Sequence, residues 1–558
     1  MSLFISRNNN SKHLFLMTTD SNKVILKANL PRVRDLSFVG RFHHNFGFEN
    51  DLFEFLLDQK ELWGDKLFYI NEKQFSNWVQ EEKHKIKEVP ISSNDLGFAD
   101  LNVQNVSEES FYEKFGQNTP IHMNFSKGDQ SHEQALARGD SVDLHSKIGR
   151  NGLALNVGGT ITAMKWLPYG DISCLAVFVI NHEDGLAASI SDPTLSILPN
   201  KANGKVKSCI QIWTCSDDVR SMTLSAVYDT TAFGVTKELS WLPVKFSNET
   251  IGVLMGGFSD GKLHFYKIVR SISEQTNYYE ILEPSFTIAV KDERQEKQEI
   301  VPITSYDLLD HTKVIVGTLD GAIAEFMLPG LEDPKTLKIP SFMEYLADSS
   351  IVSITIAPVQ KSHVLLVNTA TTQAFALQYD NLRQGRVESN YTISTLKPLH
   401  HNGYRIFVYP DSAESIGYTF VRHPHQKHVL LLRTELVSTF HISEFLNHPF
   451  ALVGNIMGDV YVMNIGRKIF GVPKANNKLV VPLKLWSLTK DETGSIINLR
   501  GDYVPTSSEK SDVLYSFTPP EVVISASAWN ETLESSSTYA FGTYTGLLVL
   551  ERLDPLMN

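Results

Sequence analysis

One stretch of the chain, residues 251–268, constrains the fold most, because it has the pattern of a complete β-hairpin. An apolar run is followed by Ser259-Asp260-Gly261 and then by a second run rich in Leu, Phe, Tyr and Ile. An Asp-Gly pair accepts the positive φ angles that a tight hairpin connection requires. Similar hairpins are predicted at residues 318–326, 455–462 and 543–550. Regular hairpins at long intervals are typical of a repeat architecture.

From Gly158 onward the strand and turn patterns divide into units of three or four short strands, with insertions near 183–205 and 466–520. No helical periodicity separates the units, which argues against a parallel α/β sheet. Small antiparallel sheets that pack radially around a channel hide both faces of each sheet. The sequence therefore predicts an all-β protein, with a seven-bladed β-propeller over residues 158–558.

The chain before the propeller has a different pattern. Residues 1–150 are predicted to form a helical and extended arm that is partly disordered. A helix is expected at roughly 51–63, because Asp51 and Glu54 can form a capping box and the apolar residues recur at helical spacing. Its apolar face is too large to hide alone, so we expect it to dock on the main domain or on a partner. Residues 88–150 are rich in polar residues and Gly, which favours an extended, locally disordered segment.

Charge and cysteine content narrow the function classes. The formal net charge of -12 argues against a chain that coats nucleic acid through bulk electrostatics. The three cysteines are too few for a disulfide framework, which favours a reducing compartment. Neither a signal peptide nor a window of 18 apolar residues is found, so we expect a soluble intracellular protein without a membrane contact.

Catalytic and metal-binding patterns are not found. The sequence has no Gly-x-x-x-x-Gly-Lys-[Ser/Thr], no Gly-x-Ser-x-Gly and no His-Glu-x-x-His. His423, His425 and His428 are the nearest metal-like group, but an acidic ligand is missing and a loop between strands is the favoured interpretation. We therefore expect no enzyme, cofactor, metal or small-molecule substrate. A propeller hydrolase would need carboxylates or histidines that converge from several blades around the axis.

Five basic residues near the amino terminus are candidates for contact with nucleic acid or a partner. Arg32, Arg34 and Arg41 could meet a phosphate backbone or an acidic patch, and ordinary solvation is the alternative. His43 and His44 beside them could also touch phosphate, although the polar face of a docked helix is favoured.

Two tryptophans have a structural interpretation. Trp166 and Trp241 each precede Leu-Pro at the end of a predicted strand. Packing between blades is favoured over ligand contact, because a large ring at a strand end fills the space between neighbouring sheets.

Several segments resemble a known family. They read Gly-Gly-Thr-Ile-Thr-Ala-Met-Lys-Trp-Leu-Pro at 158–168, Cys-Ile-Gln-Ile-Trp at 209–213, Leu-Ser-Trp-Leu-Pro at 239–243 and Gly-Gly-Phe-Ser-Asp-Gly at 256–261. A later segment, 448–460, fits the same pattern. Together they resemble the WD-repeat, β-propeller subunit of transcription factor IIIC, the fungal tau complex.

The resemblance implies a function. It implies a non-catalytic structural subunit in the nucleus, which pairs with a second β-propeller subunit and a large DNA-contacting subunit. In that family the pair supports recognition of the B-box promoter and transcription of tRNA genes by RNA polymerase III, and promoter DNA is held mainly through the complex. The alternative is a propeller scaffold of another nuclear or cytoplasmic complex, since propellers host many functions.

Overall fold

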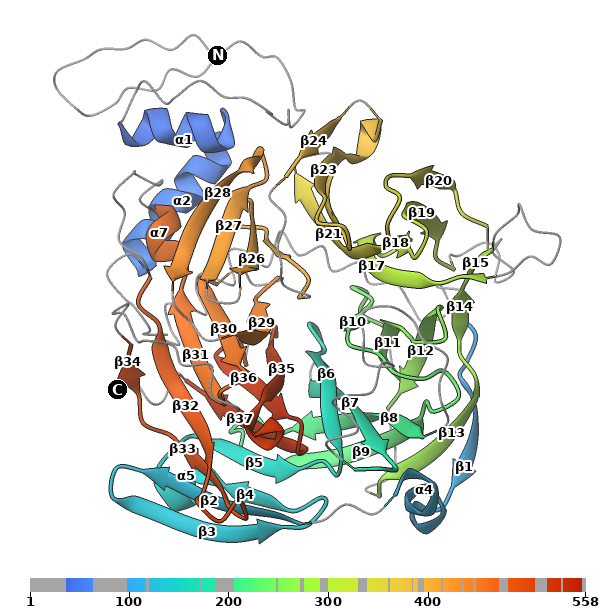
Figure 1. Ribbon diagram of the computed structural model, residues 1–558, viewed down its shortest axis with the longest axis vertical. Coiled ribbons are helices and arrows are strands. Elements are labelled where there is room, and N and C mark those ends of the chain that lie inside the picture. Colours follow the sequence, from blue (N-terminus) through green and yellow to red (C-terminus); the bar gives the residue numbers. More distant parts are fainter. Residues whose placement is uncertain are drawn as a thin grey trace.

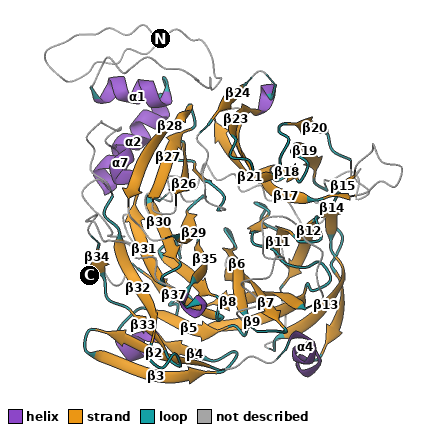
Figure 2. Cartoon of the chain, viewed as in Figure 1, coloured by secondary structure: helices purple, strands orange, loops and turns teal. Residues whose placement is uncertain are grey.

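The computed structural model describes most of the chain, in segments separated by gaps. The described residues are 37–63, 98–116, 120–170, 172–185, 205–246, 249–270, 275–291, 300–329, 339–359, 362–383, 385–389, 396–412, 415–432, 436–444, 448–470, 480–506, 519–532 and 535–553. Figure 1 shows their arrangement: sheets stand side by side around a central axis, and helices lie at the periphery. The coloring by secondary structure in Figure 2 shows that strands predominate. The predicted mainly β fold and its propeller arrangement are thus confirmed.

We number the sheets of four or more strands in chain order, and for each sheet we name the strand nearest the central axis first. Sheet 1 comprises β6 (Thr160–Trp166), β7 (Ser173–His182), β8 (Val206–Cys215), β9 (Met222–Asp229), β13 (Asn277–Glu283) and β1 (Asn102–Val106). Sheet 2 comprises β10 (Leu239–Trp241), β11 (Thr250–Gly257), β12 (Leu263–Val269) and β14 (Phe286–Ile288). Sheet 3 comprises β17 (Ile303–Asp310), β18 (Lys313–Thr318), β19 (Ala322–Met327) and β20 (Phe342–Tyr345).

The ring continues through the second half of the chain. Sheet 4 comprises β21 (Ile351–Val359), β22 (Ser362–Thr369), β23 (Ala374–Gln378) and β24 (Arg386–Glu388). Sheet 5 comprises β25 (Leu399–His401), β26 (Ile406–Ser412), β27 (Ser415–Phe420) and β28 (His423–Leu432). Sheet 6 comprises β29 (Val437–Ile442), β30 (Phe450–Asn455), β31 (Asp459–Asn464), β32 (Leu483–Lys490), β33 (Ile497–Arg500), β2 (Ile121–Lys127), β3 (Gln130–Leu136) and, paired with β32, β34 (Val504–Pro505). Sheet 7 comprises β35 (Ile524–Trp529), β36 (Thr538–Thr543), β37 (Leu547–Arg552), β5 (Gly152–Asn156) and β4 (Ser141–Asp143).

Smaller elements connect or cover the sheets. A two-stranded ribbon is formed by β15 (Val290–Lys291) and β16 (Ile300–Val301). The helices are α1 (Phe38–Phe46), α2 (Asn50–Trp63), α4 (Glu108–Phe115), α5 (Leu144–Ile148) and α7 (Gly466–Phe470), with short 3₁₀ turns η2 (Tyr379–Asn381) and η3 (Pro520–Val522).

The predicted hairpins are present, and glycine explains their turns. Residues 251–268 form most of β11 and β12, which pair antiparallel. Gly261, Gly321, Gly458 and Gly546 occupy equivalent turns, with φ angles of 81°, 90°, 88° and 89°. A Cβ atom at Gly321 would lie only 1.7 Å from the carbonyl oxygen of Ala347. Because side chains disfavour this φ region and this turn leaves no room, glycine is required there.

Apolar side chains fill the space between neighbouring sheets. Trp166 is fully buried in a cluster shared by sheets 1 and 7. Trp241 belongs to a cluster shared by sheets 1 and 2, and its indole N–H donates to the carbonyl oxygen of Lys165 at 3.2 Å. The predicted packing role of both tryptophans is therefore confirmed.

The segment before the ring contains more β-strands than the sequence predicted. Residues 88–150 were expected to be an extended, partly disordered arm, but β1, β2, β3 and β4 add to the edges of sheets 1, 6 and 7. The prediction was wrong for these strands because a strand on a sheet edge needs only one apolar face. In β2, for example, only Ile121, Met123 and Phe125 are fully buried, in alternation with polar neighbours.

Ring closure also depends on this segment. The last strand, β37, pairs antiparallel with β5, and β5 pairs with β4. The start of the ring predicted at Gly158 therefore falls too late, since a closing strand precedes it. The insertion predicted at 466–520 likewise holds β32 and β33 of sheet 6. Most of the other insertion, residues 186–204, lies outside the described residues.

The predicted amino-terminal helix is confirmed as α2, and its docking is visible. Phe42 and Phe46 of α1 and Leu52 and Leu56 of α2 are buried in the same apolar cluster as residues of sheets 5 and 6. Figure 1 shows α1 and α2 beside α7 and β28 at the outer side of the ring. The apolar face therefore docks on the main domain, one of the two outcomes expected.

Candidate functional site

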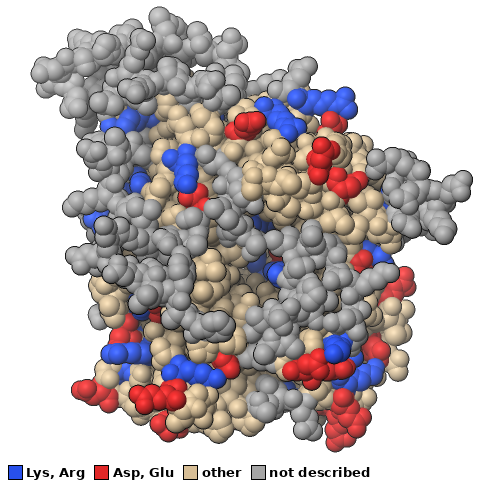
Figure 3. Space-filling model, viewed as in Figure 1, with Lys and Arg blue, Asp and Glu red and all other residues tan. Residues whose placement is uncertain are grey.

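Charged side chains from most of the sheets meet at the centre of the ring. We call this group the channel cluster, and it consists of Lys165, Glu238, Asp307, Lys397, His441, Glu444 and Glu531. Each member lies on the innermost strand of a sheet or within a few residues of one. Figure 3 shows a hollow at the centre of one face, with blue Lys or Arg atoms inside it.

One half of the channel cluster is organised by Lys165 of β6. Its ammonium nitrogen lies 3.0 Å from a carboxylate oxygen of Glu444 and 3.8 Å from one of Glu531. The same nitrogen lies 3.4 Å from Nε2 of His441. The Glu531 carboxylate also accepts the backbone N–H of Glu444 at 2.5 Å. One lysine thus ties sheet 1 to sheets 6 and 7.

The other half is organised by Lys397, which precedes β25. Its ammonium nitrogen lies 2.7 Å from Glu238 and 3.5 Å from Asp307, and it donates to the carbonyl oxygen of Tyr306 at 3.1 Å. Asp307 accepts the backbone N–H of Ile356 at 2.7 Å. Sheets 2, 3, 4 and 5 are therefore joined around this second lysine.

The pKa values in the channel cluster follow burial and pairing. Burial opposes the charge of both lysines, but their carboxylate partners raise the pKa of each above its ordinary value. Burial would raise the pKa of Glu444, yet Lys165 and its other cationic neighbours lower it to about 2. For Asp307 burial prevails over the attraction of Lys397 and raises the pKa to about 6. Burial and then Lys165 lower the pKa of His441 to about 3, so this ring is neutral near pH 7.

The chemistry of the channel cluster is that of paired charges. Each of its four carboxylates lies within 4 Å of a lysine ammonium group. No group of three or more His, Cys, Asp or Glu residues suited to a metal ion occurs among the residues that the structure describes. The carboxylates and histidine that a propeller hydrolase would need do converge here, but the carboxylates are held as salt bridges across sheet boundaries.

Three of the five residues predicted to contact nucleic acid or a partner, Arg41, His43 and His44, lie on α1 and do not belong to the channel cluster. Arg32 and Arg34 lie outside the described residues. Arg41 is buried, and the backbone carbonyl of His44 accepts a hydrogen bond from Nε2 of His423. His43 is half-buried, and its ring centroid lies 4.3 Å from that of the exposed Phe48. α1 thus contacts β28 through His44, while Arg41 is buried and His43 lies beside an exposed aromatic ring.

The histidine group at 423–428 was predicted to lie in a loop, but it lies on β28. The prediction was wrong because a proline and three histidines within six residues are typical of a turn. An outer strand that is covered by a helix can also contain proline and histidine. The rings of His44 and His423 are 5.1 Å apart. Burial lowers the pKa of His423 and of His428 to about 4, so neutral imidazoles pack where α1 docks.

A second charged network, which we call the closing latch, is completely buried. Arg150 donates from Nε and Nη2 to the two carboxylate oxygens of Glu551, at 2.5 Å each, and both side chains are 0% exposed. Further donors and rings complete the latch: Trp486 donates to Glu551 at 3.0 Å, Tyr503 donates to it at 2.9 Å, and the guanidinium lies 3.9 Å and 4.1 Å from the Trp486 and Tyr503 rings. The latch joins the segment before β5 to sheets 6 and 7, where the ring closes.

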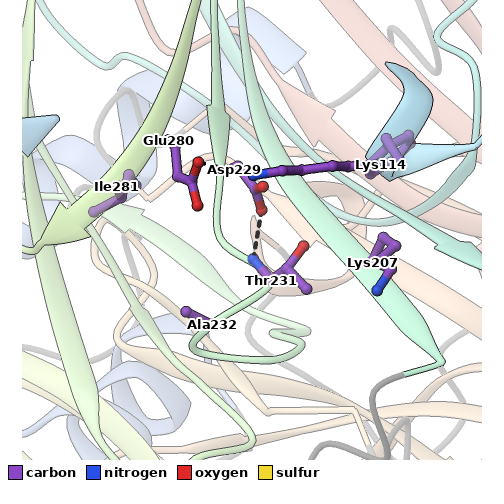
Figure 4. Close-up of a pocket in the computed structure, with 8 residues that line it drawn as sticks. Lys114, Lys207, Asp229, Thr231, Ala232, Glu280 and Ile281 are labelled. Carbon is purple, nitrogen blue, oxygen red and sulfur yellow. Dashed lines mark hydrogen bonds and ion pairs between the residues drawn. The ribbon is translucent and has the colours of Figure 1, made fainter. Parts of the chain in front are cut away.

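The structure also has a cleft of about 360 Å³ at the outer part of sheet 1 (Figure 4). Lys114 of α4 reaches over it to Glu280 of β13, at 2.8 Å, and Lys207 lines the other side. The backbone N–H of Thr231 donates to Asp229 at 2.9 Å. Acidic and basic groups balance in this cleft, so its charge does not select one kind of ligand.

Sequence reasoning did not find the channel cluster or the closing latch. Their members come from distant parts of the chain: Arg150 and Glu551, for instance, are 401 residues apart. One signal was available for Glu551, which follows four apolar residues of β37 at a fully buried position. A lone charge in such a run indicates a buried partner from another sheet.

Comparisons with known proteins give one curated relative. The chain is 26% identical over 444 residues to the transcription factor tau 91 kDa subunit of Saccharomyces cerevisiae, and the match covers 77% of this chain. The chain spans 60% of the length of that subunit. The resemblance stated from the sequence is thereby confirmed. No protein-family model matches the chain.

Among solved structures, the crystal structure of Chaetomium thermophilum Raptor is similar at a TM-score of 0.42 and 11% identity, over 72% of this chain and 28% of that one. This similarity is too low to support an argument about function. Within the described part of the chain, no helix has the length and apolar character needed to cross a membrane.

Proposed function

We propose that this chain is a non-catalytic propeller subunit of transcription factor IIIC, the tau complex. The observation that carries the proposal is the similarity to the tau 91 kDa subunit over 444 residues. The propeller arrangement supports it, since a rigid ring with large side surfaces suits a subunit that positions others. The salt-bridged state of the channel cluster also favours a structural role over a catalytic one.

We propose partners and a location from the same similarity. The chain would act in the nucleus, paired with a second β-propeller subunit and a large DNA-contacting subunit, and would support B-box recognition at tRNA genes. With a formal net charge of -12, the isolated chain should bind DNA weakly, and affinity should come mainly from its partners. Arg32, Arg34 and His43 are the candidates for direct contact with a phosphate or an acidic partner.

We propose that each of sheets 1 to 7 is one blade of the ring. The contacts between neighbouring sheets support this count. They run from β6 to β10 of sheet 2, from β11 of that sheet to β17, and then through β21, β25, β29 and β35 back to β6. In the same proposal residues 98–156 belong to the ring, while α1 and α2 form the helical part of an arm docked on sheets 5 and 6.

Isolation of the endogenous protein with its neighbours tests the proposed function. We expect the other tau subunits in stoichiometric amounts by mass spectrometry, and enrichment of the chain at tRNA genes by chromatin immunoprecipitation. A stable complex that contains none of them would overturn the proposal. That result would instead favour a scaffold of another assembly, which predicts no such enrichment.

DNA binding by the purified chain provides a second test. We expect weak association, because an acidic chain releases few counterions from DNA. Tight binding with a steep dependence on salt concentration would contradict the view that DNA is held through the partners.

A further inference from the structure

The outer edge of sheet 3 differs from a protected sheet edge. Its last strand, β20, pairs on one side only, with β19. Alternate residues of β20 project from one face, and two of them, Met343 and Tyr345, are 43% and 56% exposed. Met327 at the end of β19 and Ile339 just before β20 are also exposed. We call these four residues, together with the β20 backbone, the β20 edge.

Packing explains why one face of β20 is bare while the other is covered. Met343 and Tyr345 lie directly opposite Ala324 and Ala322 on β19, and these small side chains cannot cover them. On the opposite face Phe342 packs near Tyr379, with ring centroids 6.4 Å apart. Glu344 on that face pairs with Arg383 at 3.1 Å. The connection between β23 and β24, which contains η2, therefore packs against one face of β20.

Other outer edges of the ring are protected. β24 of sheet 4 places Arg386 and Glu388 on its edge, and β3 of sheet 6 is mostly polar. β14 of sheet 2 is covered by Phe98, whose ring lies 6.0 Å from that of Phe286. β28 of sheet 5 is covered by α1 through the contact between His44 and His423. Charge, polarity and coverage are the usual protections against strand addition, and among the residues that the structure describes none of them protects the exposed face of β20.

We propose that the β20 edge is a docking site for an extended segment of a partner protein, which adds to sheet 3 as a further strand. The segment would have alternating apolar residues to cover Met343 and Tyr345, and a basic residue to face Asp348. Asp348 is exposed and accepts a hydrogen bond from the Tyr345 hydroxyl, so it lies at the end of this surface. Strand addition uses main-chain hydrogen bonds for affinity and alternate side chains for specificity.

Charge favours a basic partner over a second copy of this chain. A second copy would bring another acidic surface, from a chain of net charge -12, against Asp348. Like charges across an interface disfavour association, whereas a basic flank would be attracted. This inference rests on the proposed function, because that function identifies the partner as a tau subunit.

The test uses the full chain in complex with the other tau subunits. The double variant Met343→Lys with Tyr345→Lys places two charges on the bare face, and we expect its affinity for the partner subunits to fall roughly tenfold or more. Leu282→Lys is the matched control, because Leu282 is 57% exposed on β13 of sheet 1. It should assemble like the wild type. Equal affinity of the double variant and the wild type would overturn the inference.

Hydrogen exchange keeps the inference testable if the double variant folds poorly. Amides of residues 342–345 in the wild-type chain should exchange more slowly in the complex than in the free chain, and unchanged exchange would refute docking at this edge. A free chain that sediments as a dimer, with these amides protected, would show that a second copy is the occupant and would overturn the choice of a basic partner. If the wild-type chain binds no tau subunit at all, the proposed function fails, and that result is distinct from failure of the surface.

Discussion

The closing latch and the channel cluster use the same kinds of charged groups in different surroundings. In the latch, Arg150 and Glu551 are 0% exposed, and tyrosine and tryptophan donors occupy the remaining sites of the carboxylate. In the channel cluster, Lys165 is 13% exposed and its partner Glu444 is 37% exposed. Water therefore reaches the Lys165–Glu444 pair of the channel cluster, although Glu531 there is buried, but it cannot reach the charges of the latch.

The comparison shows at which ion pair a single substitution should destabilise the ring most. A dry ion pair depends completely on its partners, because each charge left alone would have to be buried without water. When one partner of a hydrated ion pair is removed, water solvates the charge that remains, and the loss of stability is smaller. The latch lies at the closure between the first and last parts of the chain, so its loss should affect the whole ring.

The largest effect is expected from Arg150→Met, which leaves the Glu551 carboxylate buried without a cation. We expect a loss of about 3–5 kcal/mol in the free energy of unfolding, the usual range for breaking a buried ion pair. Urea denaturation followed by circular dichroism measures it. Arg150→Met combined with Glu551→Met should lose less than Arg150→Met alone, because no charge is stranded. A single variant within about 1 kcal/mol of the wild type would show that the latch is not dry in solution.

A smaller effect is expected from Lys397→Met in the channel cluster. Glu238 and Asp307 lose their shared cation but keep access to water, since their side chains are 36% and 26% exposed. We expect a loss of about 1–2 kcal/mol, between the values for exposed and fully buried pairs. The loss should shrink in 1 M salt, whereas that of Arg150→Met should not. The same denaturation series in low and high salt measures both, and equal salt responses would remove the distinction between the two networks.

The pH dependence of stability should reveal Asp307. Its folded-state pKa of about 6 lies above the ordinary aspartate value of 3.8, so the folded state binds more protons between these pH values. This residue therefore adds stability as the pH falls from about 6 to about 4. In Asp307→Asn that gain is lost, and the wild type should become more stable relative to the variant by about 1–2 kcal/mol between pH 7 and pH 4. Urea midpoints at stepwise pH values measure the difference, and a constant difference would show that Asp307 keeps an ordinary pKa.

The sequence predicted the propeller arrangement because the information for it is local. The Asp-Gly and related turns at Gly261, Gly321 and Gly458 define hairpins within a few residues, and their φ angles are those the turns require. The resemblance to a tau subunit likewise depends on short segments such as 158–168. Both could be recognised without knowing which strands become neighbours.

The networks at the centre and at the closure could not be predicted in this way. Their charges meet only after sheets far apart in sequence have packed, as Lys165 with Glu444 and Glu531 shows. The outer strands β2 and β3 were missed for a related reason, because β2 is stabilised by pairing with β33 of sheet 6, and the largely polar β3 by pairing with β2, and not by their own propensity. The five predicted contact residues remain untested as contacts, although Arg41 is buried and His44 already contacts His423 of β28.

The smallest effect is expected from Lys114→Ala at the cleft of Figure 4. This substitution extends the comparison of buried and hydrated ion pairs to a pair at the surface. Lys114 and Glu280 are 2.8 Å apart, closer than several pairs in the channel cluster, but they are 55% and 37% exposed. Exposed pairs contribute little because water screens the attraction and two long side chains lose freedom. We expect a loss below about 0.5 kcal/mol, with no additional loss in the double variant Lys114→Ala, Glu280→Ala. If this variant cost as much as Lys397→Met, distance and not hydration would determine the strength of these ion pairs, and the contrast between latch and channel would need another cause.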